Sequence, residues 1–241
     1  MKIVSAHQPH YLPWIGYFHK IAQSNTFVIV DNVDLTRPSY INRNTLTGKA
    51  GQFNLTIPIK HTSNFKLIKD AEIDYYTNRW ITKHIRSIIH HYSSTEFSQL
   101  FIDFISNTLH KKHKWLFDLD TEIIYFLLNY LEIKTEVIIA SEKNIGGQKE
   151  TDLFLSLLSV TNSDTILIGK GASSSYMDRE VILANNYKIA IQDFEHPVYT
   201  QKSKVFCKGI SVLDFLMNVP KAEAIQIIKH QSGNFKIYER S

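Results

Sequence analysis

The sequence lacks the features that would mark an exported, membrane-spanning or disulfide-stabilised protein. Its 241 residues include one cysteine, Cys207, which excludes an internal disulfide and a zinc site built from several thiolates. No stretch approaches the roughly 18 uninterrupted apolar residues that a membrane span requires. The apolar stretch after Met1 is too short for the core of a signal peptide. We therefore expect a soluble protein of a reducing compartment, the cytoplasm.

Concentrated positive charge is also lacking, although the net charge is +4. Lysine and arginine are dispersed along the chain, and their densest cluster is the segment from His110 to Lys114. Cations at the end of a helix complement the helix dipole, so we interpret this cluster as a solvated helix end. Nucleic acid is therefore not an expected partner.

Apolar residues, in contrast, make up 44% of the chain, which is enough to build one large core. Short apolar runs alternate with helical patterns, as is typical of β–α–β units and a parallel sheet. We predict an α/β fold with a Rossmann-like, mostly parallel sheet, and a single domain over residues 1–241. The expected strands are 2–6, 27–31, 135–140, 165–168 and 188–191, and the expected helices are 13–22, 151–160 and 178–185.

The middle of the chain departs from this alternation. Apolar and polar side chains alternate over residues 53–59, which predicts a half-buried strand, and Pro58 places that strand at an edge. Residues 72–132 then carry three successive helical patterns. We expect them to form a helical block that packs on the sheet or is inserted into it.

The loop after the first expected strand is rich in polar and aromatic residues. Open parallel sheets place their ligand crevices at the carboxyl ends of strands. This loop offers His7, Gln8, His10, Tyr11 and Trp14, which suit a pocket that stacks a flat ligand and hydrogen-bonds its edge. The alternative is that the aromatic side chains only fasten the first helix to the sheet.

Two histidines are candidate acids or bases, because imidazole exchanges protons near neutral pH. His7 is the first candidate. His196 is the second, since Pro197 holds it in an extended conformation after the strand 188–191; alternatively, His196 only bonds a loop carbonyl. His7 and His10 have no nearby Cys, Asp or Glu to complete a ligand set, so no metal site is expected.

Two other loops carry groups that suit anions. Arg43 offers a planar fork of donors for phosphate or carboxylate, and Asn42 adds an amide; alternatively, Arg43 pairs with a surface carboxylate. Lys170 lies between two glycines and ahead of three serines, an arrangement that resembles a small phosphate-binding turn. The turn lacks the spacing of a Walker motif.

Segments along most of the chain resemble the WbqC-like family. The opening signature consists of His7-Gln8-Pro9, Tyr11-Leu12-Pro13-Trp14 and Gly16-Tyr17-Phe18-His19-Lys20-Ile21. Further similar segments run from Phe27 to Val33, Tyr40 to Asn44, Thr151 to Leu153, Leu167 to Gly171, Ser175 to Asp178, and Gln192 to Tyr199.

The resemblance implies a role in surface polysaccharide (O-antigen) biosynthesis, since the family is known mainly from such gene clusters and has been proposed to transfer glycine to an amino sugar. It also implies that four residues of the matched segments contribute to substrate binding: Asp31, Tyr176, Gln192 and Tyr199. Asn32 stands where the usual pattern has a second Asp, and Ala172 to Ser175 replace a charged stretch. These departures leave the acceptor open.

Three hypotheses follow. The first is an amide-forming transferase that acylates or glycylates a nucleotide-linked amino sugar, with a loop histidine deprotonating the amine and Arg43 holding phosphate or carboxylate. The second is an ATP-dependent ligase or nucleotidylyltransferase using ATP with Mg²⁺, although Trp14 and Tyr17 replace both histidines of the signature that such enzymes share. The third is a non-catalytic nucleotide-sugar binding protein. The cofactor, the acyl donor and a homo-oligomeric state remain open.

Overall fold

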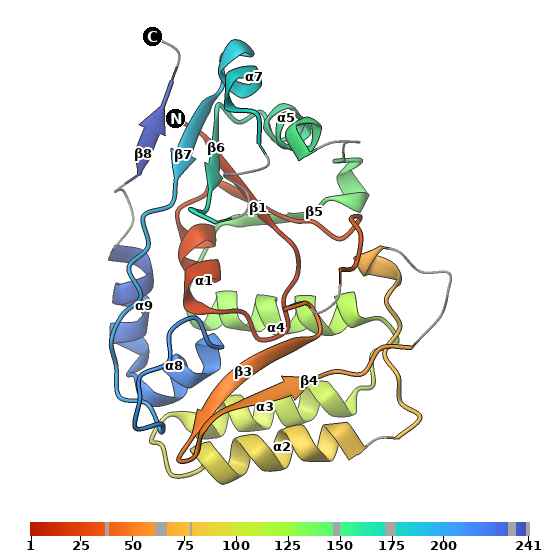
Figure 1. The fold of residues 1–241 in the computed structure, drawn as a ribbon, viewed down its shortest axis with the longest axis vertical. Coiled ribbons are helices and arrows are strands. Elements are labelled where there is room, and N and C mark those ends of the chain that lie inside the picture. The colour runs from red at the N-terminus through yellow and green to blue at the C-terminus, as the bar shows by residue number, and fades with distance from the viewer. Residues whose placement is uncertain are drawn as a thin grey trace.

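The computed structural model describes residues 1–36, 39–60, 67–77, 79–146, 150–171, 177–230 and 235–239. Its centre is a six-stranded sheet in the order β5-β2-β1-β6-β7-β8 (Figure 1). The strands are β1 (Ile3–His7), β2 (Thr26–Ile29), β5 (Glu136–Ile139), β6 (Thr165–Ile168), β7 (Lys188–Ile191) and β8 (Lys236–Tyr238). The first five are parallel, and β8 pairs antiparallel with β7. The predicted α/β fold with a mostly parallel sheet is confirmed.

Helices cover both faces of this sheet (Figure 1). Successive side chains of a strand point to opposite faces; in β2, Phe27 and Ile29 join one core cluster and Val28 joins the other. The helices α5 (Glu150–Val160) and α7 (Arg179–Ala184) pack on the face of Val28, and the helices α1 (Ile15–Ala22), α8 (Val212–Asn218) and α9 (Lys221–His230) contribute to the core on the other face. This double cover explains why the strands read as continuous apolar runs.

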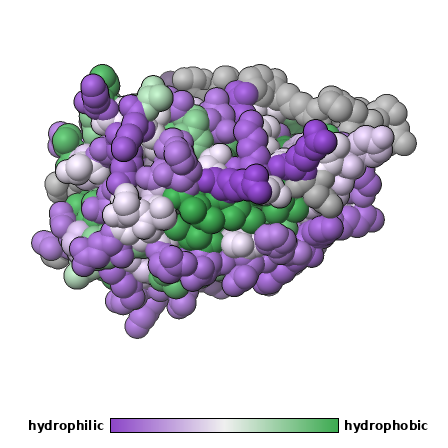
Figure 2. Space-filling model, turned by 90° about the horizontal axis from the view of Figure 1, so that it is seen from below, coloured by the Kyte–Doolittle hydropathy of each residue, from purple (hydrophilic) through white to green (hydrophobic). Residues whose placement is uncertain are grey.

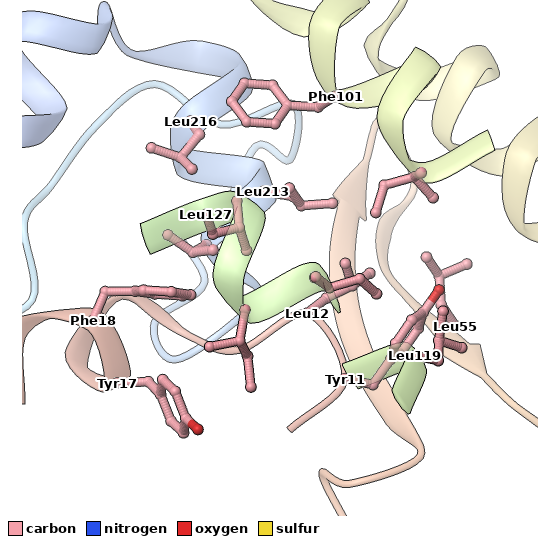
Figure 3. Close-up of a cluster of buried hydrophobic side chains, with 14 of the residues drawn as sticks. Tyr11, Leu12, Tyr17, Phe18, Leu55, Phe101, Leu119, Leu127, Leu213 and Leu216 are labelled. Carbon is pink, nitrogen blue, oxygen red and sulfur yellow. The ribbon is translucent and has the colours of Figure 1, made fainter. Parts of the chain in front are cut away.

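The predicted helical block is present, and in the sequence it lies between β2 and β5, two strands that are neighbours in the sheet. It consists of α2 (Arg79–Tyr92), α3 (Ser98–His110) and α4 (Leu116–Tyr130), which follow β2 and precede β5. Short 3₁₀ helices, η1 (Ile68–Asp70) and η2 (Ser141–Lys143), lie on either side of it. The block shares the larger core cluster with α1 and α8, and Figure 3 shows side chains of α3 and α4 meeting those of α1, α8 and β4.

The strand expected at 53–59 has different bounds in the structure and lies outside the main sheet. The observed strand, β4 (Gly51–Thr56), ends before Pro58 and pairs antiparallel with β3 (Arg43–Gly48) in a two-stranded sheet apart from the main one. Asn42 and Arg43 were expected in a loop, because the mostly polar β3 carries little apolar alternation. A two-residue turn joins the pair, and Gly51 follows it with φ +117°, a conformation that glycine adopts without strain.

The face seen from below is largely hydrophilic and carries an apolar band (Figure 2). None of the helices in the described ranges is both long enough and apolar enough to cross a membrane.

Candidate functional site

A cavity of about 550 Å³ opens at the carboxyl ends of β1, β6 and β7. His7 ends β1, Gly169 follows β6 and Gln192 follows β7. The chain builds the sheet outward from β1 first to β2 and β5, then to β6 and β7 on the other side, and parallel sheets place ligand crevices where the order reverses in this way. The described residues lining the cavity are His7, Trp14, Gly16, Tyr17, Lys20, Gly169, Lys170, Gly171, Gln192, Phe194, His196, Lys208 and Gly209.

Helix α1 forms one wall of the cavity. Gly16 and Lys20 are four residues apart, so they share a helix face with Tyr17, and this face borders the cavity. Phe18 and Ile21 lie in the apolar core instead. The helix therefore contributes the side chains of Tyr17 and Lys20 to the cavity, and Lys20 carries its charge.

Trp14 immediately precedes α1 and folds its indole over Gly16. A Cβ added at Gly16 would lie 2.2 Å from Trp14 Cη2, so the observed indole position requires glycine. The indole meets the ring of Phe194 edge to face, with 5.5 Å between the ring centroids. Two aromatic side chains from distant segments thus line the same side of the cavity.

His7 and His196 are held in the same tautomer by the same local contact. His7 Nδ1 lies 3.1 Å from the carbonyl oxygen of Gln8, and His196 Nδ1 lies 2.9 Å from that of Pro197. A carbonyl oxygen only accepts hydrogen bonds, so each Nδ1 carries the proton and each Nε2 keeps a lone pair. His196 Nε2 is buried without a hydrogen-bond partner among the described residues. Both rings can accept a proton.

The pKa values of these histidines favour the neutral form. Burial, followed by the nearby His10 and Lys20, holds the pKa of His7 well below its usual value. Burial also lowers the pKa of His196, against the opposing contact with the Pro197 carbonyl. Desolvation disfavours the charged form of a base, so both imidazoles are neutral near pH 7.

His10 lies directly behind His7, with 4.5 Å between the ring centroids. Burial and the charge of Lys20 lower the pKa of His10 to about 4, and its buried Nδ1 has no partner in the described structure. His10 does not line the cavity; it supports His7 from the protein side.

A hydrogen-bond chain fixes the loop after β7 to α1. Gln192 Nε2 donates to the Gly16 carbonyl oxygen at 2.9 Å and to His19 Nδ1 at 2.8 Å. His19 is fully buried and also packs against Phe194, with ring centroids 4.9 Å apart. Gln192 was predicted to bind substrate; the structure shows its amide joining two walls of the cavity.

The β3–β4 hairpin positions the loop between β1 and α1. Asn44 Nδ2 donates to the carbonyl oxygens of Tyr11 and Leu12, at 3.2 and 2.6 Å. Leu12 has φ +50°, a left-handed conformation that costs energy for a branched side chain. These two bonds hold the strained turn that leads from His10 to Trp14.

Positive charge dominates the cavity. Lys20, Lys170 and Lys208 line it, and none of its described lining residues is acidic. Asp193 forms an ion pair with Lys170, where both side chains are exposed. Such a lining suits an anionic ligand and does not fit a protein-held Mg²⁺, which prefers carboxylate oxygens.

Five residues that the sequence suggested for the site lie together in this cavity: His7, Trp14, Lys170, Gln192 and His196. Tyr176 lies outside the described residues.

The other suggested residues lie elsewhere. Tyr11 is fully buried among the apolar side chains of Figure 3, with its hydroxyl 3.1 Å from His84 Nδ1. Asp31 is also buried, and it accepts hydrogen bonds from the backbone and hydroxyl of Ser141. Packing and loop closure account for both side chains.

The remaining suggested residues are placed by similar contacts. Asn42 Nδ2 donates to the Ile57 carbonyl oxygen at 2.9 Å, and Arg43 is exposed at the start of β3. Tyr199 packs on Phe215, with ring centroids 5.1 Å apart. The Gln8 carbonyl oxygen accepts the hydroxyl of Tyr17 at 3.3 Å. None of these residues lines the cavity.

The cavity is also lined by residues that were not predicted from the sequence: Tyr17, Lys20, Phe194 and Lys208. Lys20 had a usable signal, since it is the one lysine or arginine of α1 and lies four residues after Gly16. Lys208 had no local signal, because only the path of the loop from Phe194 to Gly209 brings it to the cavity.

Comparisons with known proteins give matches that cover most of the chain. One relative is the "Uncharacterized protein Rv1507c" of Mycobacterium tuberculosis, which is 27% identical over 233 residues. The matched region covers 95% of this chain and 99% of the relative. No solved structure shows a significant match. The model of the WbqC-like protein family matches residues 8–226. This span contains every described cavity residue except His7. The chain therefore belongs to the WbqC-like protein family.

Proposed function

We propose that this protein forms an amide bond on the amino group of a nucleotide-linked sugar, with the cavity between α1 and the ends of β1, β6 and β7 as its active site. One observation carries the proposal. Two neutral imidazoles with free Nε2 lone pairs share a cavity with three lysines, and none of its described lining residues is acidic. This combination suits a ligand that carries both a phosphate group and a proton to be removed.

The lysines and glycines suit the nucleotide part of such a ligand. A nucleotide-linked sugar carries a negatively charged diphosphate, and lysine is a common phosphate ligand. Gly169 and Gly171 line the cavity on either side of Lys170 in the chain, a composition typical of small phosphate-binding turns. Counted along the chain, the parallel strands are in the order third, second, first, fourth, fifth, which is the order of Rossmann-like sheets that bind nucleotides at the reversal point.

The imidazoles suit the reacting part. The amine nitrogen forms a bond to the acyl carbon, and the bond from that carbon to its leaving group breaks. The proton lost by the amine passes to the Nε2 of His7 or His196 and then to the leaving group. A lysine beside the acyl oxygen would stabilise the negative charge that develops there.

Family membership supports the choice of substrate, because the family resemblance implies surface polysaccharide biosynthesis and glycyl transfer to an amino sugar. The single cysteine supports assigning this activity to the cytoplasm.

An ATP-dependent ligase is the second candidate, and the strand order favours it equally. In this mechanism the cavity binds ATP with Mg²⁺, and the nucleotide carries the metal. The distinguishing product is pyrophosphate or phosphate, formed only when ATP is present.

The test is an incubation of the purified protein with nucleotide-linked amino sugars and acyl donors, followed by mass spectrometry of the products. We expect an amide product without ATP, reduced about 100-fold or more by His7→Gln or His196→Gln, whichever is the base. His110→Gln is the control, because His110 lies on the exposed end of α3.

Product that requires ATP would select the ligase. Undiminished amide formation by the variant carrying both His7→Gln and His196→Gln would contradict the assignment of the base. Ligand binding without any turnover would favour a nucleotide-sugar binding protein.

A further inference from the structure

Lys20 is the most deeply placed cation of the cavity. It is only 6% exposed, and its Nζ donates to the carbonyl oxygen of Ala6 over 3.5 Å, a long hydrogen bond. No carboxylate within the described ranges pairs with it. Lys170, by comparison, is exposed and paired with Asp193.

An ammonium in this position is costly for folding. Lysine is almost never fully buried unless it is paired, because desolvation of a charge is compensated only by an opposite charge and good hydrogen bonds. Lys20 lowers the pKa values of the neighbouring His7 and His10, and neither ring supplies negative charge. Burial also lowers the pKa of Lys20 to about 8, so it remains mostly protonated near pH 7.

We propose that Lys20 is the inner anchor for an anionic group of the ligand, a phosphate or a carboxylate that enters the cavity beside α1. The bound ligand then supplies the negative charge that the described residues do not place beside Lys20. Lys170 and Lys208 also line the cavity and are exposed, so they would hold a second anionic group nearer solvent. The inference rests on the proposed function for the identity of the ligand, but anion binding by Lys20 does not require amide chemistry.

A ligand anchor of this kind has opposite effects on stability and on binding. Replacing an unpaired buried charge with an apolar side chain of similar length removes a desolvation cost, which is often neutral or stabilising. The same replacement removes a charge-assisted hydrogen bond to the ligand. A residue that served packing would instead lose stability when replaced.

The experiment uses the full chain with the substitutions Lys20→Met and Lys20→Gln, and Lys170→Met as the matched control on the exposed side of the cavity. Calorimetric titration at pH 7 uses three probes: uridine diphosphate, inorganic pyrophosphate and glycine. If the affinity for uridine diphosphate and pyrophosphate depends on Lys20, the anchor binds phosphate. If only the affinity for glycine depends on Lys20, the anchor binds a carboxylate. Melting temperatures are measured without ligand.

We expect both Lys20 variants to melt at or above the wild-type temperature and to bind the matching probe about tenfold or more weakly. Lys170→Met should weaken binding less than about fivefold, as expected for an exposed pair.

Unchanged affinity in both Lys20 variants, a melting temperature lowered in both, or a wild-type protein that binds none of the three probes would each overturn the inference. Lys20-dependent binding without amide product would leave this inference standing and contradict the proposed function alone.

Discussion

Glycine at position 16 decides where the indole of Trp14 lies. The ring occupies the space that any larger side chain at this position would need, and Trp14 and Gly16 both line the cavity. Glycine inside a helix costs about 0.5–1 kcal/mol relative to alanine. Glycine at the start of α1 therefore lowers the stability of the helix, but it leaves the space that the Trp14 indole occupies.

This arrangement gives a prediction for Gly16→Ala. The added methyl should displace the indole, changing Trp fluorescence and weakening nucleotide binding by about tenfold, while α1 itself gains helix propensity. Gly146→Ala is the control, since a Cβ there would meet only Asn32 Nδ2, at 3.8 Å, and Gly146 does not line the cavity. Equal binding by the two variants, measured by titration, would show that the position of Trp14 does not matter to the ligand.

Single residues also show the limit of sequence reasoning. His7, Trp14 and His196 were predictable for the cavity because they follow apolar runs that end at one edge of the sheet. Tyr11 belongs to the same loop, but the left-handed turn at Leu12 and the bonds from Asn44 direct it into the core. Only tertiary contacts decide such directions, so the sequence did not distinguish Tyr11 from Trp14.

Three elements that are distant in sequence meet at the carboxylate of Asp214. Asp214 Oδ2, at the start of α8, accepts hydrogen bonds from the hydroxyls of Thr47 on β3 and Tyr92 at the end of α2. The Tyr92 hydroxyl also accepts the Thr47 backbone N–H at 3.0 Å. All three residues are buried, so the hairpin, the helical block and the C-terminal helices share one polar junction.

Tyr92→Phe should therefore lower the free energy of unfolding by about 1–3 kcal/mol, because it leaves a buried carboxylate with one donor fewer. Urea denaturation measures the change. Tyr75→Phe is the matched control: its hydroxyl donates to the His113 carbonyl oxygen at 2.9 Å from a half-buried position, and we expect a loss below about 1 kcal/mol. Equal losses in the two variants would mean that the junction contributes little.

Elements with strong apolar patterns were predicted closely, and those that depend on partners were not. The strands 165–168 and 188–191 coincide with β6 and β7, because both are short apolar runs covered on two faces. The hairpin strand β3 was missed because its residues are mostly polar and its pairing with β4 provides the order. Helices α8 and α9 and strand β8 were also not predicted.

Buried histidines make the molecule as a whole sensitive to acid. Burial lowers the pKa of His10 and of His84 to about 4, whereas the unfolded chain has an ordinary histidine pKa near 6.5. Between these values the unfolded state binds more protons than the folded state, so stability is lost as the pH falls from about 6.5 to 4. Asp120 acts in the opposite direction, because burial raises its pKa well above the usual value.

The contribution of one histidine is measured by comparing the wild type with His10→Phe. The lost stability amounts to about 3 kcal/mol for a pKa lowered from 6.5 to about 4. His10 Nδ1 has no partner among the described residues, so phenylalanine removes the titration without removing a hydrogen bond of that nitrogen. Urea unfolding should show that the free energy of unfolding falls less between pH 7 and pH 4.5 in the variant than in the wild type. An equal fall in both proteins would contradict the lowered pKa of His10.

The central position of β1 has a consequence for synthesis on the ribosome. Ile3 pairs with Thr165, so one edge of the first strand waits for roughly 160 further residues, or roughly 10–30 s at typical elongation rates. During that interval β1, β2 and the helical block can form, but the open edge of β1 remains available to other chains. The pairing that closes this edge of β1 can therefore form only after β6 has emerged.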